Sequence, residues 1–199
     1  ETTIFVMRHC EKEGPEVVDQ DGNQHCSYLG HERAQFLPTL FGDHKYPVPS
    51  MLYALSAKRK HDFNFREIET LVPLANKYGL PIQADYGSNG RLVKHLFHKI
   101  ASGEMCGQLA LVSWKHDMIG DLARKLACPT CPRDYPENVY DDVWQFKYVY
   151  DVQGTAVISA LNTHLIPTTN GDLQLRKKNK SKNLDCLLYT PDAADDLPR

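Results

Sequence analysis

The sequence lacks any apolar stretch long enough to span a bilayer, which argues against a membrane-spanning protein. It also lacks a strong charge of either sign, because 23 Lys and Arg residues stand beside 25 Asp and Glu residues. This balance argues against a nucleic-acid-binding protein that depends on bulk positive charge. We see no internal repeat and no second domain, and 199 residues suffice for one large domain with a sizeable core.

Cysteine is scarce for a disulfide-stabilised scaffold, since the 199 residues include only six cysteines. Cys128 and Cys131 have the CxxC spacing, but a zinc site needs four ligands, and the sequence has no second CxxC and no HxxxH. The pair follows a predicted helix and is flanked by prolines, so we expect a loop with a local disulfide or free thiols. We expect no metal and no cofactor, and we favour a cytoplasmic location.

Short apolar runs alternate with segments of helical periodicity along most of the chain. The pattern predicts strands at 3–7, 51–55, 81–84 and 109–114, and helices at 29–41, 66–78, 91–101 and 117–127. Residues 143–149 and 155–161 are expected to form a terminal hairpin. The alternation predicts a three-layer α/β/α sandwich with a mostly parallel mixed sheet. We assign residues 1–170 to this domain and residues 171–199 to a polar C-terminal tail.

Residues suited to phosphoryl chemistry follow two of the predicted strands. Arg8 and His9 follow the first strand, His116 and Asp117 follow the strand at 109–114, and Arg66 begins a helix. Because the carboxyl ends of parallel strands meet at one edge of a sheet, we expect these side chains to converge. One histidine would attack phosphorus, the cations would offset charge on its oxygens, and a carboxylic acid would protonate the leaving oxygen. This chemistry requires no metal.

Four segments together carry a resemblance to a known family. They are Val6–Lys12 with Arg-His and Glu-Lys, Leu29–Ala34 with Leu-Gly-x-x-Arg-Ala, Arg66–Thr70 with Arg-x-x-x-Thr, and Leu111–His116 with a second histidine. In this order and spacing, the chain resembles the histidine phosphatase superfamily, whose fold is also called phosphoglycerate mutase-like. The resemblance implies a phosphatase that hydrolyses a small phosphomonoester, without metal, through a phosphohistidine. We expect a small phosphorylated substrate as partner, and neither nucleic acid nor a membrane.

The resemblance also implies roles for individual residues. His9 would be the phosphorylated nucleophile, Arg8 and Arg66 would bind the phosphoryl group, and His116 would be the second histidine of the pocket. The segment between Ser56 and Arg66 is longer than is usual in the family. Arg59 is therefore a rival for the second phosphate-binding arginine.

The general acid has three candidates. The mutase branch of the family uses a Glu from the region after the second arginine's helix, where this chain offers only Asp85, so a mutase is less expected than a phosphatase. His116-Asp117 resembles the His-Asp pair of the acid phosphatase and phytase branch, so we take Asp117 as the acid. Glu11 and Asp85 are the alternatives.

Cys10 departs from the family pattern, which usually has Gly or Ala at this position. Its side chain adds bulk and an oxidisable sulfur beside the phosphate. This departure and the open identity of the acid support two alternatives to a phosphatase. One is a catalytically impaired pseudo-enzyme that still binds phosphate, and the other is a family member recruited to non-phosphatase chemistry.

Overall fold

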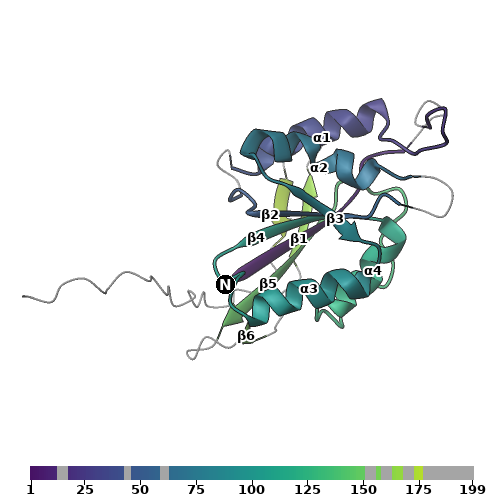
Figure 1. Cartoon of the computed structure of the whole chain (residues 1–199). Coiled ribbons are helices and arrows are strands. Elements are labelled where there is room, and N and C mark those ends of the chain that lie inside the picture. Colours follow the sequence, from purple (N-terminus) through teal and green to yellow (C-terminus); the bar gives the residue numbers. More distant parts are fainter. Residues whose placement is uncertain are drawn as a thin grey trace, which may run out of the picture.

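The computed structural model describes residues 1–12, 18–42, 46–58 and 63–150, and the backbone of three short strands within residues 156–176 (Figure 1). The elements form one mixed sheet with helices on both faces. In chain order they are β1 (Thr2–Arg8), α1 (Tyr28–Leu40), β2 (Met51–Leu55), α2 (Arg66–Tyr78), β3 (Ile82–Tyr86), α3 (Asn89–Ala101), β4 (Leu109–Trp114), α4 (His116–Lys125), β5 (Val143–Tyr150), β6 (Ala156–Val157), β7 (Thr163–Pro167) and β8 (Leu173–Arg176).

The strand order is β3-β2-β4-β1-β5-β7-β8, and β6 pairs with β5. The first four strands in this order run parallel, whereas β5 and the strands beyond it pair antiparallel with their neighbours. The register aligns Arg8 with Trp114 across β1 and β4, and Met7 with Val143 across β1 and β5. The carboxyl ends of β1 and β4 therefore lie beside the residues that lead into β5.

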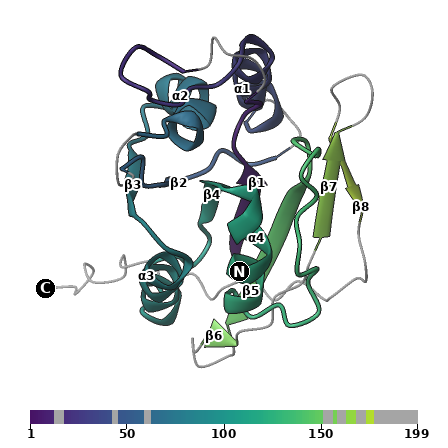
Figure 2. The ribbon, with the colours of Figure 1, turned by 90° about the vertical axis from the view of Figure 1, so that its right-hand side faces the viewer.

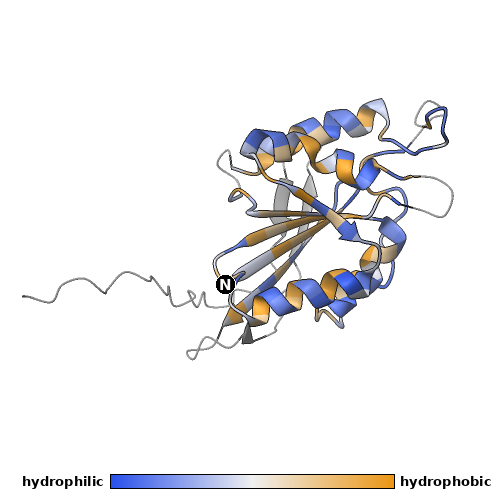
Figure 3. Cartoon of the chain, in the orientation of Figure 1, coloured by the Kyte–Doolittle hydropathy of each residue, from blue (hydrophilic) through white to orange (hydrophobic). Residues whose placement is uncertain are grey.

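Two hydrophobic cores fill the space between the layers. Figures 1 and 2 show α1 and α2 on one face of the sheet and α3 and α4 on the other. Alternate residues of β1 serve the two cores: Phe5 and Met7 pack on the side of α1 and α2, while Ile4 and Val6 pack on the side of α3 and α4. Figure 3 shows the apolar strands at the centre and helices that turn a polar face outward. The arrangement confirms the predicted three-layer sandwich with a mixed sheet.

The predicted elements agree closely with the structure. The bounds of β2, α2 and β4 are those expected, and the other helices and parallel strands differ from expectation by one or two residues at an end. The antiparallel pairing of β5 with β6 agrees with the predicted hairpin. Leu173–Arg176, in the expected C-terminal tail, forms β8 and pairs with β7, so the sheet continues beyond the residues that resemble the family.

Candidate active site

The carboxyl ends of β1 and β4 bring Arg8, His9 and His116 to one edge of the sheet. The backbone N–H of His9 donates to the carbonyl of Trp114 at 3.1 Å, which extends the β1–β4 pairing by one residue. Arg66 arrives at the same edge as the first residue of α2. The predicted convergence of two histidines and two arginines is therefore present in the structure.

His9 is buried, with 2% of its surface exposed. Its Nδ1 lies 2.7 Å from the carbonyl oxygen of Cys10. A carbonyl can only accept, so Nδ1 carries the hydrogen and Nε2 keeps a free lone pair. Burial is the largest cause that lowers the pKa of His9 from 6.5 to about 3; the hydrogen bond to the Cys10 carbonyl opposes this shift, and the neighbouring charges of Arg8, Arg66 and His116 contribute to it. His9 is thus neutral near pH 7, which is the form that can act as a nucleophile.

Arg8 is fully buried and is held by the segment that leads into β5. Its Nη1 donates to the carbonyl oxygens of Glu137 and Val139, and its Nη2 donates to the Tyr140 hydroxyl at 3.0 Å. The guanidinium carbon also lies 3.7 Å from the centre of the Tyr140 ring. Its Nε is buried and has no hydrogen-bond partner among the described residues, so Arg8 keeps a donor for an anion.

Arg66 is anchored on both its backbone and its side chain. Its carbonyl oxygen accepts from the Thr70 hydroxyl at 2.6 Å, and its Nε donates to the carbonyl of His25 at 3.0 Å. The same Thr70 hydroxyl accepts from the backbone N–H of Cys10 at 2.8 Å. Thr70 therefore joins the start of α2 to the residue that follows the candidate nucleophile.

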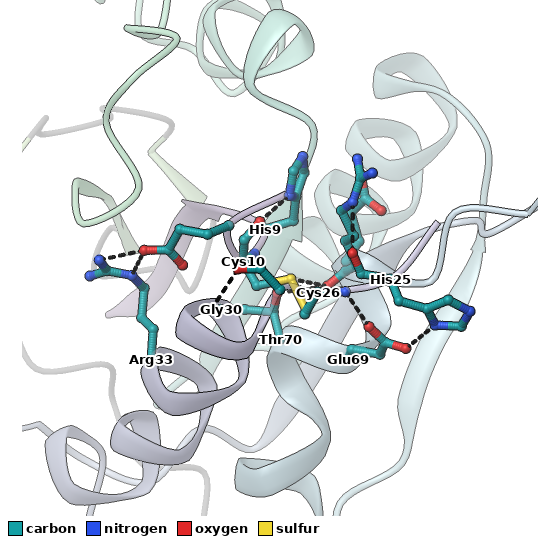
Figure 4. Close-up of a disulfide and its surroundings, with 12 residues drawn as sticks. His9, Cys10, His25, Cys26, Gly30, Arg33, Glu69 and Thr70 are labelled. Atoms are coloured by element: carbon teal, nitrogen blue, oxygen red, sulfur yellow. Dashed lines mark hydrogen bonds and ion pairs between the residues drawn. A yellow bond between two sulfur atoms is a disulfide. The ribbon is translucent and has the colours of Figure 1, made fainter. Parts of the chain in front are cut away.

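A disulfide joins Cys10 to Cys26 next to His9, and Figure 4 shows this bond between the end of β1 and the loop before α1. The two Cα atoms lie 5.5 Å apart. Sequence reasoning predicted an oxidisable sulfur at Cys10 but did not identify its partner. Gly30 is essential to the close packing here, because a Cβ added to it would lie 2.9 Å from both the Cys10 Cβ and the backbone of Glu11.

The three candidate acids occupy different surroundings. Asp117 lies in the first turn of α4, half-exposed, and its carboxylate pairs with Lys115 at 2.6 Å. Glu11 is buried and pairs with Arg33 at 2.5 Å. Asp85 lies on β3, which is separated from β1 by β2 and β4, at about 14 Å for three strand spacings.

His116 begins α4, and burial lowers its pKa, with Arg8 and Lys12 acting in the same direction. Its Nδ1 is buried without a hydrogen-bond partner among the described residues. The neutral imidazole is therefore favoured in the free protein. Arg59, the predicted rival of Arg66, lies outside the described residues.

Tyr140 and its neighbours are the part of the site that sequence reasoning missed. The rings of Tyr140 and His9 lie 6.3 Å apart in an edge-to-face arrangement. A cavity of 440 Å³ opens beside Tyr140, and it is lined by Glu11, Lys12, Leu29, Arg33, Glu137, Asn138, Tyr140 and Asp141. Glu11, Lys12, Leu29 and Arg33 belong to motifs that the sequence analysis identified, whereas nothing in the sequence indicated that residues 137–141 lie beside them.

Cys128 and Cys131 form a local disulfide, one of the two outcomes expected for this pair. Cys106 is also disulfide-bonded. In the described part of the chain, no group of three or more His, Cys, Asp or Glu side chains is placed to hold a metal ion. None of the described helices combines the length and the apolar character needed to cross a membrane.

Comparisons with known proteins identify the fold. No protein-family model matches the sequence, and no curated protein matches it. Among solved structures, the protein histidine phosphatase SixA, complexed with tungstate, matches 78% of this chain and 92% of its own with a TM-score of 0.52 at 16% identity. A mycobacterial glucosyl-3-phosphoglycerate phosphatase matches 81% and 98% with a TM-score of 0.53 at 12% identity, and a structure described as mycobacterial hydrolase 1 matches 92% and 100% with the same TM-score and identity. The chain therefore has the phosphoglycerate mutase-like fold of the histidine phosphatase superfamily.

Proposed function

We propose that this protein is a phosphatase that hydrolyses a small phosphomonoester through a phosphohistidine formed on His9. The observation that carries the proposal is the state of His9. Its Nδ1 donates to a backbone carbonyl, its Nε2 keeps a lone pair, and its pKa is lowered to about 3. A neutral, buried imidazole beside two guanidinium groups suits attack on a phosphoryl group.

In the first step, Nε2 of His9 attacks phosphorus as the bond from phosphorus to the leaving oxygen breaks. Arg8 and Arg66 offset the negative charge on the equatorial oxygens, and an imidazole N–H of His116 donates a hydrogen bond to one of them. In the second step, water attacks the phosphohistidine, releases inorganic phosphate and regenerates neutral His9. Each of these roles is a proposal for the residue named.

Asp117 is the proposed general acid that protonates the leaving oxygen. Its carboxylate pairs with Lys115 in the first turn of α4, so it must exchange Lys115 for the substrate before it can act on the leaving oxygen. Glu11 is less suited because its buried carboxylate is already paired with Arg33. Asp85 is less suited because two strands separate β3 from β1.

The cavity beside Tyr140 is the proposed site for the organic part of the substrate. It adjoins Arg8 and His9 through Tyr140, and its walls carry charges of both signs. A polar leaving group of modest size fits 440 Å³ with this lining. The structural likeness to SixA and to the mycobacterial phosphatase supports a phosphorylated substrate in general.

Disulfides persist in oxidising compartments and are rare in the cytosol. The pairs Cys10–Cys26 and Cys128–Cys131 therefore favour an oxidising compartment over the cytoplasmic location that we expected.

A single assay tests the activity. The purified protein, without added metal, is incubated with p-nitrophenyl phosphate and with sugar, nucleotide and isoprenoid phosphates, beside a His9→Ala control. We expect release of inorganic phosphate by the wild type and its loss in the control. Binding of phosphate without turnover on any compound would instead support the pseudo-enzyme.

The role of Asp117 is tested by the leaving group. Asp117→Asn should slow hydrolysis most for esters with poor leaving groups, because only these need a proton on the departing oxygen. An equal loss for good and poor leaving groups would argue against Asp117 as the acid.

A further inference from the structure

The disulfide between Cys10 and Cys26 has no part in the proposed phosphoryl transfer, yet it lies between two residues that do. Cys10 follows His9 directly, and Cys26 follows His25, whose carbonyl accepts from Arg66 Nε at 3.0 Å. One covalent bond therefore connects the backbone of the proposed nucleophile to the anchor of the proposed phosphate-binding arginine. Figure 4 shows the yellow sulfur bond between these two parts of the site.

The two sulfur atoms also touch Arg66. The Sγ atoms of Cys10 and Cys26 lie 3.6 and 3.8 Å from the Arg66 carbonyl oxygen. Because both sulfurs are in a disulfide, neither carries a hydrogen to donate, and these are packing contacts. The disulfide thus packs against the backbone of Arg66, the first residue of α2.

Glu69 holds the loop from the other side. One of its carboxylate oxygens accepts from the backbone N–H of Cys26 at 2.7 Å, and the other lies 2.6 Å from Nδ1 of His25. Figure 4 shows Glu69 reaching both partners from α2. The position of the His25 carbonyl is therefore set by Glu69 on one side and by the disulfide on the other.

We propose that the Cys10–Cys26 disulfide is a positioning element that holds the Arg66 guanidinium at the distance from His9 at which both reach one phosphoryl group. The inference rests on the proposed role of Arg66 in binding that group. Without the disulfide, the hydrogen bond from Ser27 N–H to the Glu11 carbonyl, at 2.8 Å, still joins the loop to the end of β1. The backbone N–H of Cys10 also still donates to the Thr70 hydroxyl at 2.8 Å. Glu69 keeps the loop attached to α2, so loss of the covalent bond lets the His25 carbonyl and Arg66 shift together relative to His9. The unusual residue at position 10 is then part of the phosphate site and not a defect in it.

The test is a double-mutant cycle read out by anion binding. Cys10→Ala/Cys26→Ala is combined with Arg66→Ala, and the dissociation constants of inorganic phosphate and of tungstate are measured by calorimetry. Alanine at position 10 is a residue that the family itself uses, so the change adds no bulk. The matched control is Cys128→Ala/Cys131→Ala, which removes a disulfide outside the site.

In the wild-type background, Arg66→Ala should weaken phosphate binding about 10-fold or more, as expected for loss of a charge-assisted contact. Removal of the Cys10–Cys26 bond should weaken binding by a similar factor, and Arg66→Ala should then add less than about 3-fold, because coupled residues are not additive. In the Cys128/Cys131 control, phosphate binding and the full effect of Arg66→Ala should be retained. Additive losses in the first cycle, or unchanged binding without the Cys10–Cys26 bond, would overturn the proposal.

Folding and activity are followed separately. If Cys10→Ala/Cys26→Ala does not fold by circular dichroism, binding is measured on the Cys128→Ala/Cys131→Ala protein after mild treatment with dithiothreitol. Alkylation followed by peptide mass spectrometry quantifies the free thiols of Cys10 and Cys26 separately from that of Cys106, which is also disulfide-bonded. The affinity should fall in proportion to that thiol fraction, and an affinity independent of it would refute the inference. Because phosphate binding needs no turnover, a protein that binds phosphate with the predicted coupling but hydrolyses no ester would disprove the phosphatase alone. Failure of the wild type to bind phosphate or tungstate would overturn the positioning role.

Discussion

His9 should make the folded protein sensitive to acid, and the size of the effect follows from its burial. Its pKa is about 3 in the folded protein and 6.5 in an unperturbed histidine. Between these values the unfolded chain binds a proton at this position and the folded chain does not. Stability is therefore fully present above pH 6.5 and declines as the pH falls toward 3. At pH 5 the loss is about 2 kcal/mol, from 1.5 pH units at 1.36 kcal/mol each.

The assay compares the wild type with His9→Gln by urea unfolding at pH 8 and at pH 5. Glutamine is close in size and can donate to the Cys10 carbonyl, but it does not titrate. We expect the wild type to lose about 2 kcal/mol more than the variant between the two pH values, since the contributions of all other groups cancel in the difference. Equal losses in the two proteins would refute the reasoning. So would a titration of the His9 ring by NMR with a midpoint near 6.5.

The same pKa has a consequence for catalysis. At pH 5, about 99% of His9 is neutral if its pKa is 3, against about 3% if its pKa is 6.5. Protonation of His9, the proposed nucleophile, should therefore not limit kcat/KM of the free protein for a phosphomonoester at this pH. A loss of kcat/KM with a midpoint near pH 6.5 that coincides with the NMR titration of the His9 ring would contradict this expectation.

Three further predictions concern the surroundings of His9. Removing the disulfide with Cys10→Ala/Cys26→Ala should lower the free energy of unfolding in urea by about 3 kcal/mol, from the entropy of a closed loop with a sequence separation of 16; a loss near zero would contradict this estimate. Gly30→Ala should lower the free energy of unfolding by about 1–3 kcal/mol in the same measurement, because the new Cβ would lie 2.9 Å from the Cys10 side chain and from the backbone of Glu11. A variant as stable as the wild type would contradict this prediction and show that α1 moves away freely. Glu69 raises the pKa of His25, so Glu69→Gln should move the NMR titration of His25 down toward 6.5, and an unmoved midpoint would exclude this pairing in solution.

The sequence was sufficient to predict the parallel half of the sheet and the residues that converge at its edge. Strands such as β4 are continuous apolar runs because helices cover both faces, and such runs are visible without a structure. Once β1 and β4 are taken as parallel, Arg8 and His116 must follow strand ends at the same edge. Periodicity likewise predicts α2, whose first residue is Arg66.

The disulfide beside His9 was not predictable from sequence spacing. Cys10 and Cys26 are separated by a loop without periodicity, and four cysteines lay outside the CxxC pair. Their approach depends on tertiary contacts of the loop before α1. The N–H of Ser27 donates to the Glu11 carbonyl, and the N–H of Phe65 donates to the carbonyl of Gln24. Neither contact has a signature in the order of the residues.

The residues that cover Arg8 could not be predicted from the sequence. The apolar pattern of residues 143–149 predicts a strand but does not show which strand β5 pairs with. Because β5 runs antiparallel to β1, with Met7 opposite Val143, the residues just before Val143 lie beside Arg8. Tyr140 then stacks on the guanidinium, and the carbonyl oxygens of Glu137 and Val139 accept from it. A parallel β5 would have placed this segment at the opposite edge of the sheet. The direction of one strand therefore decides that the proposed phosphate-binding arginine, Arg8, is oriented by backbone carbonyls and an aromatic ring. It also leaves Nε of Arg8 as the donor that an incoming anion can use.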